Sequence, residues 1–176
     1  MCLRVTAAII AAALLPGLAA AQQASPVAQA FRENAQEAGK NLMAAADEMP
    51  AGKYGFKPTK AQMTFGAIVV HLAEGNDYLC SSIAGTKAPS RSKITATDKK
   101  DALLARLRET FQFCDESLAQ LDDAKLGEQL PFFGGRTMSR AKIMTITTGD
   151  WADHYSQSAI YLRLNGHLPP TAKKKE

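Results

Sequence analysis

The sequence has few of the residues that build disulfide scaffolds or metal arrays. Cysteine and histidine occur three times each among 176 residues. These counts exclude a disulfide-rich miniprotein and a multi-zinc array, but they leave enough ligands for one metal ion. Neither sign of charge dominates, and a net charge of +4 is too small to require nucleic acid as a partner. With 46% hydrophobic residues, the composition predicts one globular domain.

A long hydrophobic run is also missing. The apolar stretch from Val5 to Leu15 is well short of the roughly 20 residues that cross a bilayer. It follows Arg4 and precedes small residues that end at Ala21, which is the order found in secretory signal peptides. We therefore expect residues 1–21 to be a signal peptide. The mature protein would begin at Gln22, would be periplasmic or secreted, and would have no stable membrane insertion.

Hydrophobic residues recur every three or four positions in four segments of the mature chain, and no stretch shows sustained strand alternation. The polar stretch 86–98 is long for a tight helical hairpin and suits a crossover connection. The pattern predicts an all-α four-helix bundle over residues 22–170, followed by a basic C-terminal tail over 171–176. The expected helices span about 26–49, 61–84, 98–121 and 139–165.

Two residues within these helices are expected to make specific contacts across the bundle. Asn76 stands within the apolar stripe of the second helix, where we expect it to form a hydrogen bond across the bundle. Trp151 in the fourth helix is expected to anchor a contact between helices.

The inward stripe of the fourth helix carries a candidate metal site. Asp150 and His154 are four residues apart, so they face the same way. A buried carboxylate needs a cation or a hydrogen-bonding partner, and His71 of the second helix lies near the same seam. Two histidines and one carboxylate leave coordination positions open, as in catalytic zinc and non-haem iron sites. The alternative is that Asp150 and His154 only pair with each other.

Several motifs spread over most of the mature chain are similar to those of the DinB superfamily of four-helix proteins. The resemblance implies a bundle of up-down-down-up order with an open metal site at one end, where His71 and His154 match two of the family's histidines. It also implies a histidine where this chain has Asp150. The motifs are Phe56-Lys57-Pro58-Thr59, Thr64-Phe65-Gly66, His71-Leu72-Ala73, His154-Tyr155-Ser156-Gln157 and Tyr161-Leu162-Arg163-Leu164-Asn165-Gly166.

Some relatives in this superfamily use the metal to activate a thiol cofactor, so the resemblance implies a metal-dependent transferase or hydrolase acting on a small molecule. Zinc is the expected metal, followed by nickel or iron. Gln157 is expected to support a ligand from the outer shell of the site. The competing hypothesis is a non-catalytic binding or interaction protein with a degenerate site, because Asp150 replaces a histidine. The sequence leaves a homodimer open.

Cleavage of residues 1–21 would remove Cys2 and leave Cys80 and Cys114 as a pair. Two cysteines in an oxidising compartment are a candidate disulfide. If the second and third helices run parallel, as the resemblance implies, the two residues differ in height by only about 5 Å. Two buried free thiols are the alternative.

Cleavage of the expected signal peptide predicts the mass of the mature protein. Protein purified from the cell that makes it should have the intact mass of residues 22–176, because cleavage follows Ala21. A product that still begins at Met1 and is recovered with membranes would contradict both the signal peptide and the predicted compartment.

Overall fold

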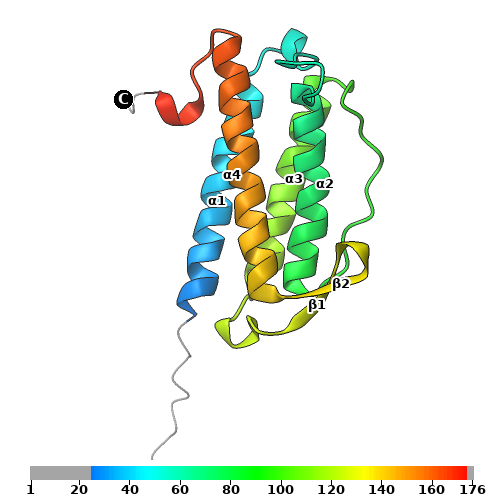
Figure 1. Cartoon of the computed structure of the whole chain (residues 1–176), viewed down its shortest axis with the longest axis vertical. Helices are drawn as coiled ribbons and strands as arrows, with labels where there is room; N and C mark the ends of the chain where they lie inside the picture. Colours follow the sequence, from blue (N-terminus) through cyan, green and yellow to red (C-terminus); the bar gives the residue numbers. More distant parts are fainter. Residues whose placement is uncertain (1–24, 174–176) are drawn as a thin grey trace, which may run out of the picture.

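The computed structural model describes residues 25–173 and shows a four-helix bundle with a small hairpin at one end (Figure 1). The predominantly helical prediction is confirmed, and each expected helix is present. The elements are α1 (Pro26–Glu48), α2 (Phe65–Ala84), α3 (Lys100–Leu118), β1 (Gln129–Phe132), β2 (Arg136–Ser139) and α4 (Arg140–Leu164), with short 3-10 turns between and after them.

The prediction of an all-α fold was wrong at the hairpin. Strands β1 and β2 pair antiparallel, with Gln129 opposite Ser139 and Phe132 opposite Arg136. Each strand has four residues, which is too short for alternation of polar and apolar residues to stand out. Gly134 and Gly135 both have positive φ angles, of 68° and 70°, and so allow the tight turn. The Gly-Gly pair was the sequence signal for this turn.

Contacts between helices fix their relative directions. Asn76 bonds Thr110, and four residues later Cys80 meets Cys114, so α2 and α3 run in the same direction. Helix α4 runs opposite to α2. His71 within α2 faces Asp150, whereas Met63, which lies just before α2 begins, contacts Tyr161, a residue later in α4. Figure 1 shows α2 and α3 side by side, with the connection 85–99 returning along the outside of the bundle.

Helix α2 begins at Phe65, four residues later than the hydrophobic pattern predicted. The side chain of Thr64 accepts a hydrogen bond from the main-chain N–H of Ala67 at 3.2 Å, which is an N-cap. The main-chain N–H groups of Phe65 and Gly66 donate to carbonyls of the preceding linker. Because these partners satisfy the free N–H groups at the helix start, the residues before Thr64 remain outside the helix.

Gly66 is required where the crossover connection meets the start of α2. A Cβ atom at this position would lie 2.4 Å from the carbonyl oxygen of Ala96. The contact is with main chain, so a side chain could be accommodated only by moving the connection itself. Gly66, the last residue of the Thr64-Phe65-Gly66 motif, therefore allows residues 86–98 to pack on α2.

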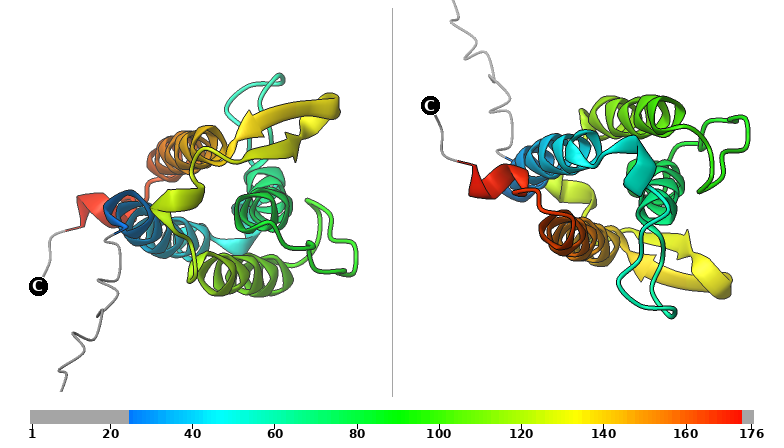
Figure 2. Two further views of the ribbon diagram at one scale, coloured as in Figure 1. Left: turned by 90° about the horizontal axis from the view of Figure 1, so that it is seen from below. Right: turned by 90° about the horizontal axis from the view of Figure 1, so that it is seen from above.

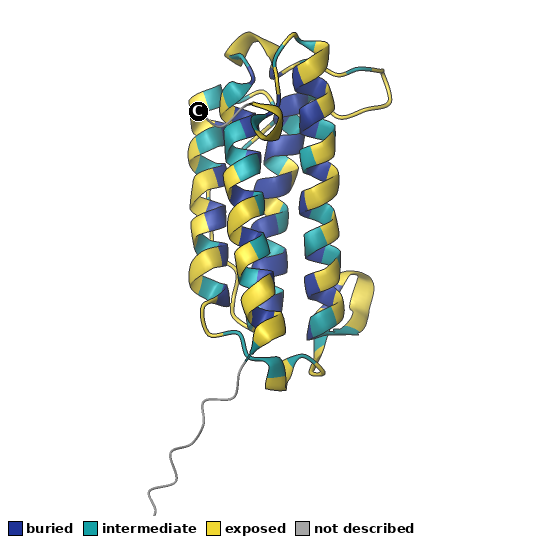
Figure 3. Cartoon of the chain, turned by 90° about the vertical axis from the view of Figure 1, so that its left-hand side faces the viewer, coloured by how far each residue is buried: buried dark blue, intermediate teal, exposed yellow. Residues whose placement is uncertain are grey.

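The buried faces of the four helices meet in one core. Figure 3 shows buried residues along the inner sides of the helices and exposed residues on their outer sides. No helix within residues 25–173 combines the length and apolar character needed to cross a membrane. The largest fully buried side chains are Trp151, Tyr161, Phe65, Leu42, Met49, Ile68, Leu72, Ile83, Leu103, Leu107, Leu118 and Ile143.

The first residues of the predicted basic tail contact the bundle. The hydroxyl of Thr171 lies 2.8 Å from that of Tyr155, and the Lys173 ammonium donates to the Glu48 carboxylate. This ammonium group, together with His167, holds the pKa of Glu48 below its usual value. The chain is thus docked against α1 and α4 up to Lys173, whereas the remainder of the predicted tail and the predicted signal peptide lie outside the described residues.

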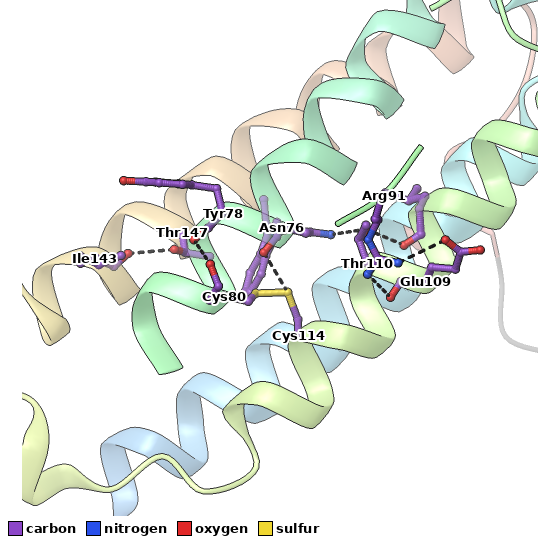
Figure 4. Close-up of a disulfide and its surroundings, with 12 residues drawn as sticks. Asn76, Tyr78, Cys80, Arg91, Glu109, Thr110, Cys114, Ile143 and Thr147 are labelled. Atoms are coloured by element: carbon purple, nitrogen blue, oxygen red, sulfur yellow. Dashed lines mark hydrogen bonds and ion pairs between the residues drawn. A yellow bond between two sulfur atoms is a disulfide. The ribbon is translucent and has the colours of Figure 1, made fainter. Parts of the chain in front are cut away.

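A buried disulfide joins Cys80 of α2 to Cys114 of α3, with Cα atoms 5.2 Å apart (Figure 4). It lies one helical turn from the hydrogen bond between Asn76 and Thr110. Both links connect the two parallel helices, so α2 and α3 are held together at two successive turns.

The disulfide predicts a measurable loss of stability on reduction. It bridges residues 34 positions apart, and a covalent loop of that length stabilises the folded state by about 3–4 kcal/mol. Denaturant unfolding with and without reductant should show this difference in free energy. In the unreduced, unfolded protein, neither Cys80 nor Cys114 should be alkylated. Alkylation of both residues, or identical unfolding curves, would refute the bridge.

Candidate metal centre

Three candidate ligands meet at the seam between α2 and α4. Asp150 and His154 lie one turn apart on α4, and the Nδ1 atom of His154 is 3.5 Å from the Asp150 Oδ1 atom. From α2, the Nε2 atom of His71 approaches the same oxygen to 3.6 Å. One ligand atom from each of the three residues lies within 4.8 Å of the others. The structure therefore brings together the three residues that the sequence predicted as ligands.

The cluster is open on one side. The side chain of His71 is 49% exposed, that of Asp150 is 23% exposed and that of His154 is 8% exposed. Helices α2 and α4 are neighbours in the bundle, as the two end-on views of Figure 2 show, and the contact of His71 with Asp150 joins them. Exposure decreases from His71 toward His154, so a small molecule from solvent would meet the α2 side of the cluster first.

The main chain of α4 sets the tautomer of His154. Its Nδ1 atom lies 2.8 Å from the main-chain carbonyl oxygen of Asp150. A carbonyl can only accept, so Nδ1 carries the proton, and in the neutral ring the lone pair is then on Nε2. Metal-binding histidines are commonly oriented by such a bond from the second ring nitrogen. One turn of helix thus supplies the carboxylate and also orients the buried imidazole.

The residues present fit a divalent metal ion. Two neutral imidazoles and one carboxylate form a donor set that suits zinc, nickel and iron. The imidazole rings of His71 and His154 are 4.6 Å apart between centroids, and the Asp150 carboxylate faces both. In the described part of the chain, these histidines are the only side chains that pair with this carboxylate. A cation between the three groups would neutralise the partly buried charge of Asp150.

Buried hydrogen bonds fix the position of α4 beside the cluster. Trp151, the residue after Asp150, donates from Nε1 to the Asn76 Oδ1 atom at 2.8 Å. The amide nitrogen of Asn76 lies 3.3 Å from the Thr110 hydroxyl of α3. The predicted hydrogen bond of Asn76 across the bundle is confirmed, and so is the predicted anchoring role of Trp151, whose ring also packs against those of Phe31 and Phe111.

Gln157 does not take the outer-shell role predicted for it. Its side-chain amide donates to the Asp153 carboxylate at 2.8 Å, one turn earlier on α4. Within residues 25–173, no hydrogen bond joins Gln157 to His71, Asp150 or His154. The i, i+4 partner on its own helix is the nearer one, and the main-chain carbonyl of Asp150 orients His154 instead.

Sequence reasoning missed Gly75, which lies one turn after His71 on α2. A Cβ atom at this position would be 3.9 Å from the Asp150 Oδ2 atom, which is an ordinary van der Waals contact, so α2 passes close to the carboxylate here. The available signal was a glycine inside a helix at i+4 from a candidate ligand, where it lowers helix stability unless packing or function requires it.

Solved structures with the same fold support this arrangement of helices. A DinB-like protein from Bacillus cereus gives a TM-score of 0.68 at 16% identity, covering 81% of this chain and 95% of that protein. A DinB-like protein from Bacillus subtilis gives 0.67 at 14% identity, covering 83% and 99%. A mutant of the mycothiol-dependent maleylpyruvate isomerase gives 0.60 at 12% identity, covering 73% and 59%. At these identities the likeness establishes the fold alone.

The sequence itself identifies the family. No curated protein sequence gives a significant match to this chain. The sequence profile of the DinB superfamily, however, matches residues 34–158, from within α1 to the second half of α4. That span is well over half of the chain and includes His71, Asp150 and His154. The chain belongs to the DinB superfamily.

Proposed function

We propose that the chain binds one divalent transition metal through His71, Asp150 and His154, and that it is a metal-dependent transferase or hydrolase. The approach of one ligand atom from each residue to within 4.8 Å of the others carries the proposal. Zinc is the first choice and nickel or iron the next, because imidazole and carboxylate ligands suit all three. Three protein ligands leave a position for water or substrate.

The two histidines differ in burial, and we assign them different roles on that basis. His154 is almost fully buried and held by the main chain, so it forms the fixed inner side of the site. His71 is half exposed and borders the side from which a substrate enters. A metal held here supplies Lewis acidity, which lowers the pKa of a bound thiol or water and makes it a nucleophile.

A thiol nucleophile has support from the structural comparison. One of the proteins with this fold is named as a mycothiol-dependent isomerase. Its likeness to this chain supports the fold, and the extension to thiol chemistry is part of our proposal. The small-molecule substrate would supply the electrophile.

Export from the cytoplasm is a second part of the proposal. It rests on the signal-like residues 1–21 and is supported by the disulfide between Cys80 and Cys114. Structural disulfides persist in oxidising compartments and are rare in the cytosol. The thiol or water used in catalysis would then have to be present outside the cytoplasm.

A non-catalytic binding role is the alternative function. The Asp150 carboxylate, which stands where the resemblance implies a histidine, already has both imidazoles within 3.6 Å. Protonated imidazoles would neutralise it without a metal. In that case His71 and His154 form ion pairs with Asp150, and the protein has the fold of the superfamily without a metal-dependent activity.

Metal titration of four proteins tests the proposal. The parent should bind one zinc ion per chain at micromolar concentration or tighter. His71→Ala, His154→Ala and Asp150→Asn should each weaken binding by about a hundredfold, since loss of even an outer-shell partner costs 10- to 100-fold. Circular dichroism should show an intact bundle in each variant, because the core does not include these side chains apart from His154.

The chain offers matched controls on α4 and just after it. Asp153→Asn removes a carboxylate three residues from Asp150, and His167→Ala removes a histidine beyond α4, so both should bind as the parent does. If the parent takes up no zinc, nickel, iron or manganese, or if Asp150→Asn and Asp153→Asn bind equally well, the three-ligand site is wrong and the non-catalytic role is preferred.

A further inference from the structure

Exposed large hydrophobic side chains gather at one end of the bundle. Met63, Ile160, Leu164 and Leu168 lie at or beside the C-terminal end of α4, and Met63 belongs there because its carbonyl accepts a hydrogen bond from Tyr161 at 2.8 Å. Four of the six such residues in the described chain are therefore at this end. The six, with their exposure, are Val27 51%, Met63 39%, Phe133 53%, Ile160 52%, Leu164 58% and Leu168 57%.

The same end carries an excess of basic side chains. It consists of the linker 50–64, the start of α3 and the end of α4, which lie together at the top of Figure 1. We call it the basic end. Its exposed basic residues that have no ion pair in the described chain are Lys53, Lys57, Lys60, Lys99 and Arg163.

Four carboxylates at the basic end oppose part of this charge, among them Asp101 in the first turn of α3, which is exposed and has no ion pair in the described chain. Asp47 pairs with Lys100, and Glu48 pairs with Lys173. Asp98 accepts hydrogen bonds from the main chain and hydroxyl of Thr95. The five exposed basic residues of the basic end all lie outside the predicted basic C-terminal tail, and the fold brings them to one end of the bundle.

We propose that the basic end docks on an anionic lipid surface. Aliphatic side chains surrounded by lysine and arginine are typical of surfaces that enter the headgroup region while the basic groups bind lipid phosphates. A nucleic acid would use the charge but would gain little from four exposed aliphatic side chains. Most residues of the linker 50–64 are exposed, including all three of its lysines, so this segment is accessible to a membrane.

Docking would be independent of the metal centre. Leu164 lies ten residues beyond His154 on α4, which is about 15 Å along the helix axis. Substitution of Leu164 or Lys60 therefore leaves the candidate ligands and their neighbours in place. A failure of docking says nothing about metal binding, and the reverse is also true.

Vesicle sedimentation tests the proposal. The full chain as purified is mixed with vesicles of phosphatidylcholine alone or with about a third phosphatidylglycerol, and all variants are used in the same form. The parent should bind the anionic vesicles, bind less at high salt, and bind neutral vesicles weakly. Leu164→Ser should lower the partition coefficient about tenfold and Lys60→Gln about fivefold.

Two residues at the opposite end of the bundle provide matched controls. The exposed fraction of Val27 is close to that of Ile160, and Lys142 is an exposed lysine near the start of α4. Val27→Ser and Lys142→Gln should bind anionic vesicles as the parent does. The proposal is overturned if the parent binds neither kind of vesicle, or if these controls lose as much binding as Leu164→Ser and Lys60→Gln.

Other occupants of the basic end would be recognised in the same experiment. If heparin binds the parent as tightly as the anionic vesicles do, and Leu164→Ser changes neither affinity, the basic end is a general polyanion site and the lipid proposal fails. If the parent is a dimer that Leu164→Ser converts to a monomer, with no vesicle binding by either, the face is an interface between copies of the chain.

Discussion

The side chain of Asn76 is the constraint on which the geometry of this bundle depends. It accepts a hydrogen bond from Trp151 of α4 and donates one to the hydroxyl of Thr110 of α3. Three helices thus meet at one buried amide, whose polar atoms would be costly to leave without partners. Asp150 and Gly75 are the residues just before Trp151 and Asn76. When α4 is rotated so that Trp151 reaches Asn76, the Asp150 carboxylate is therefore also turned toward α2.

The polar cluster at the α2–α4 seam follows from this rotation. Trp151 fills the interior, Asp150 lies at the edge of the core, and His154 is held one turn later by the carbonyl of Asp150. Such a cluster on rigid helices needs little reorganisation to hold a cation. The disulfide one turn from Asn76 restricts separation of α2 from α3, and the hydrogen bond from Trp151 to Asn76 holds α4, so both sides of the seam are supported independently of any metal.

Hydrophobic periodicity predicted the four helices. The cysteine count and the expected helix directions predicted the cysteine pair, and spacing together with the family resemblance predicted the three residues of the cluster. Sequence reasoning missed features that depend on short segments or on tertiary contacts. Strands β1 and β2 are too short to show alternation, and the start of α2 is set by Thr64 and linker carbonyls rather than by hydrophobicity. Gln157 was assigned by its position along the helix, but the nearer carboxylate of Asp153 determines its partner. The basic end joins segments far apart in sequence.

X-ray absorption spectroscopy of the zinc-loaded protein tests the proposed metal site most directly. The site predicts two imidazole ligands at about 2.0–2.1 Å, oxygen ligands at about 2.0–2.2 Å, and no sulfur scatterer at about 2.3 Å. Substitution of either His71 or His154 by alanine should remove one imidazole from the spectrum. A spectrum with sulfur ligands, or one in which the imidazole count stays the same in both variants, would contradict the site.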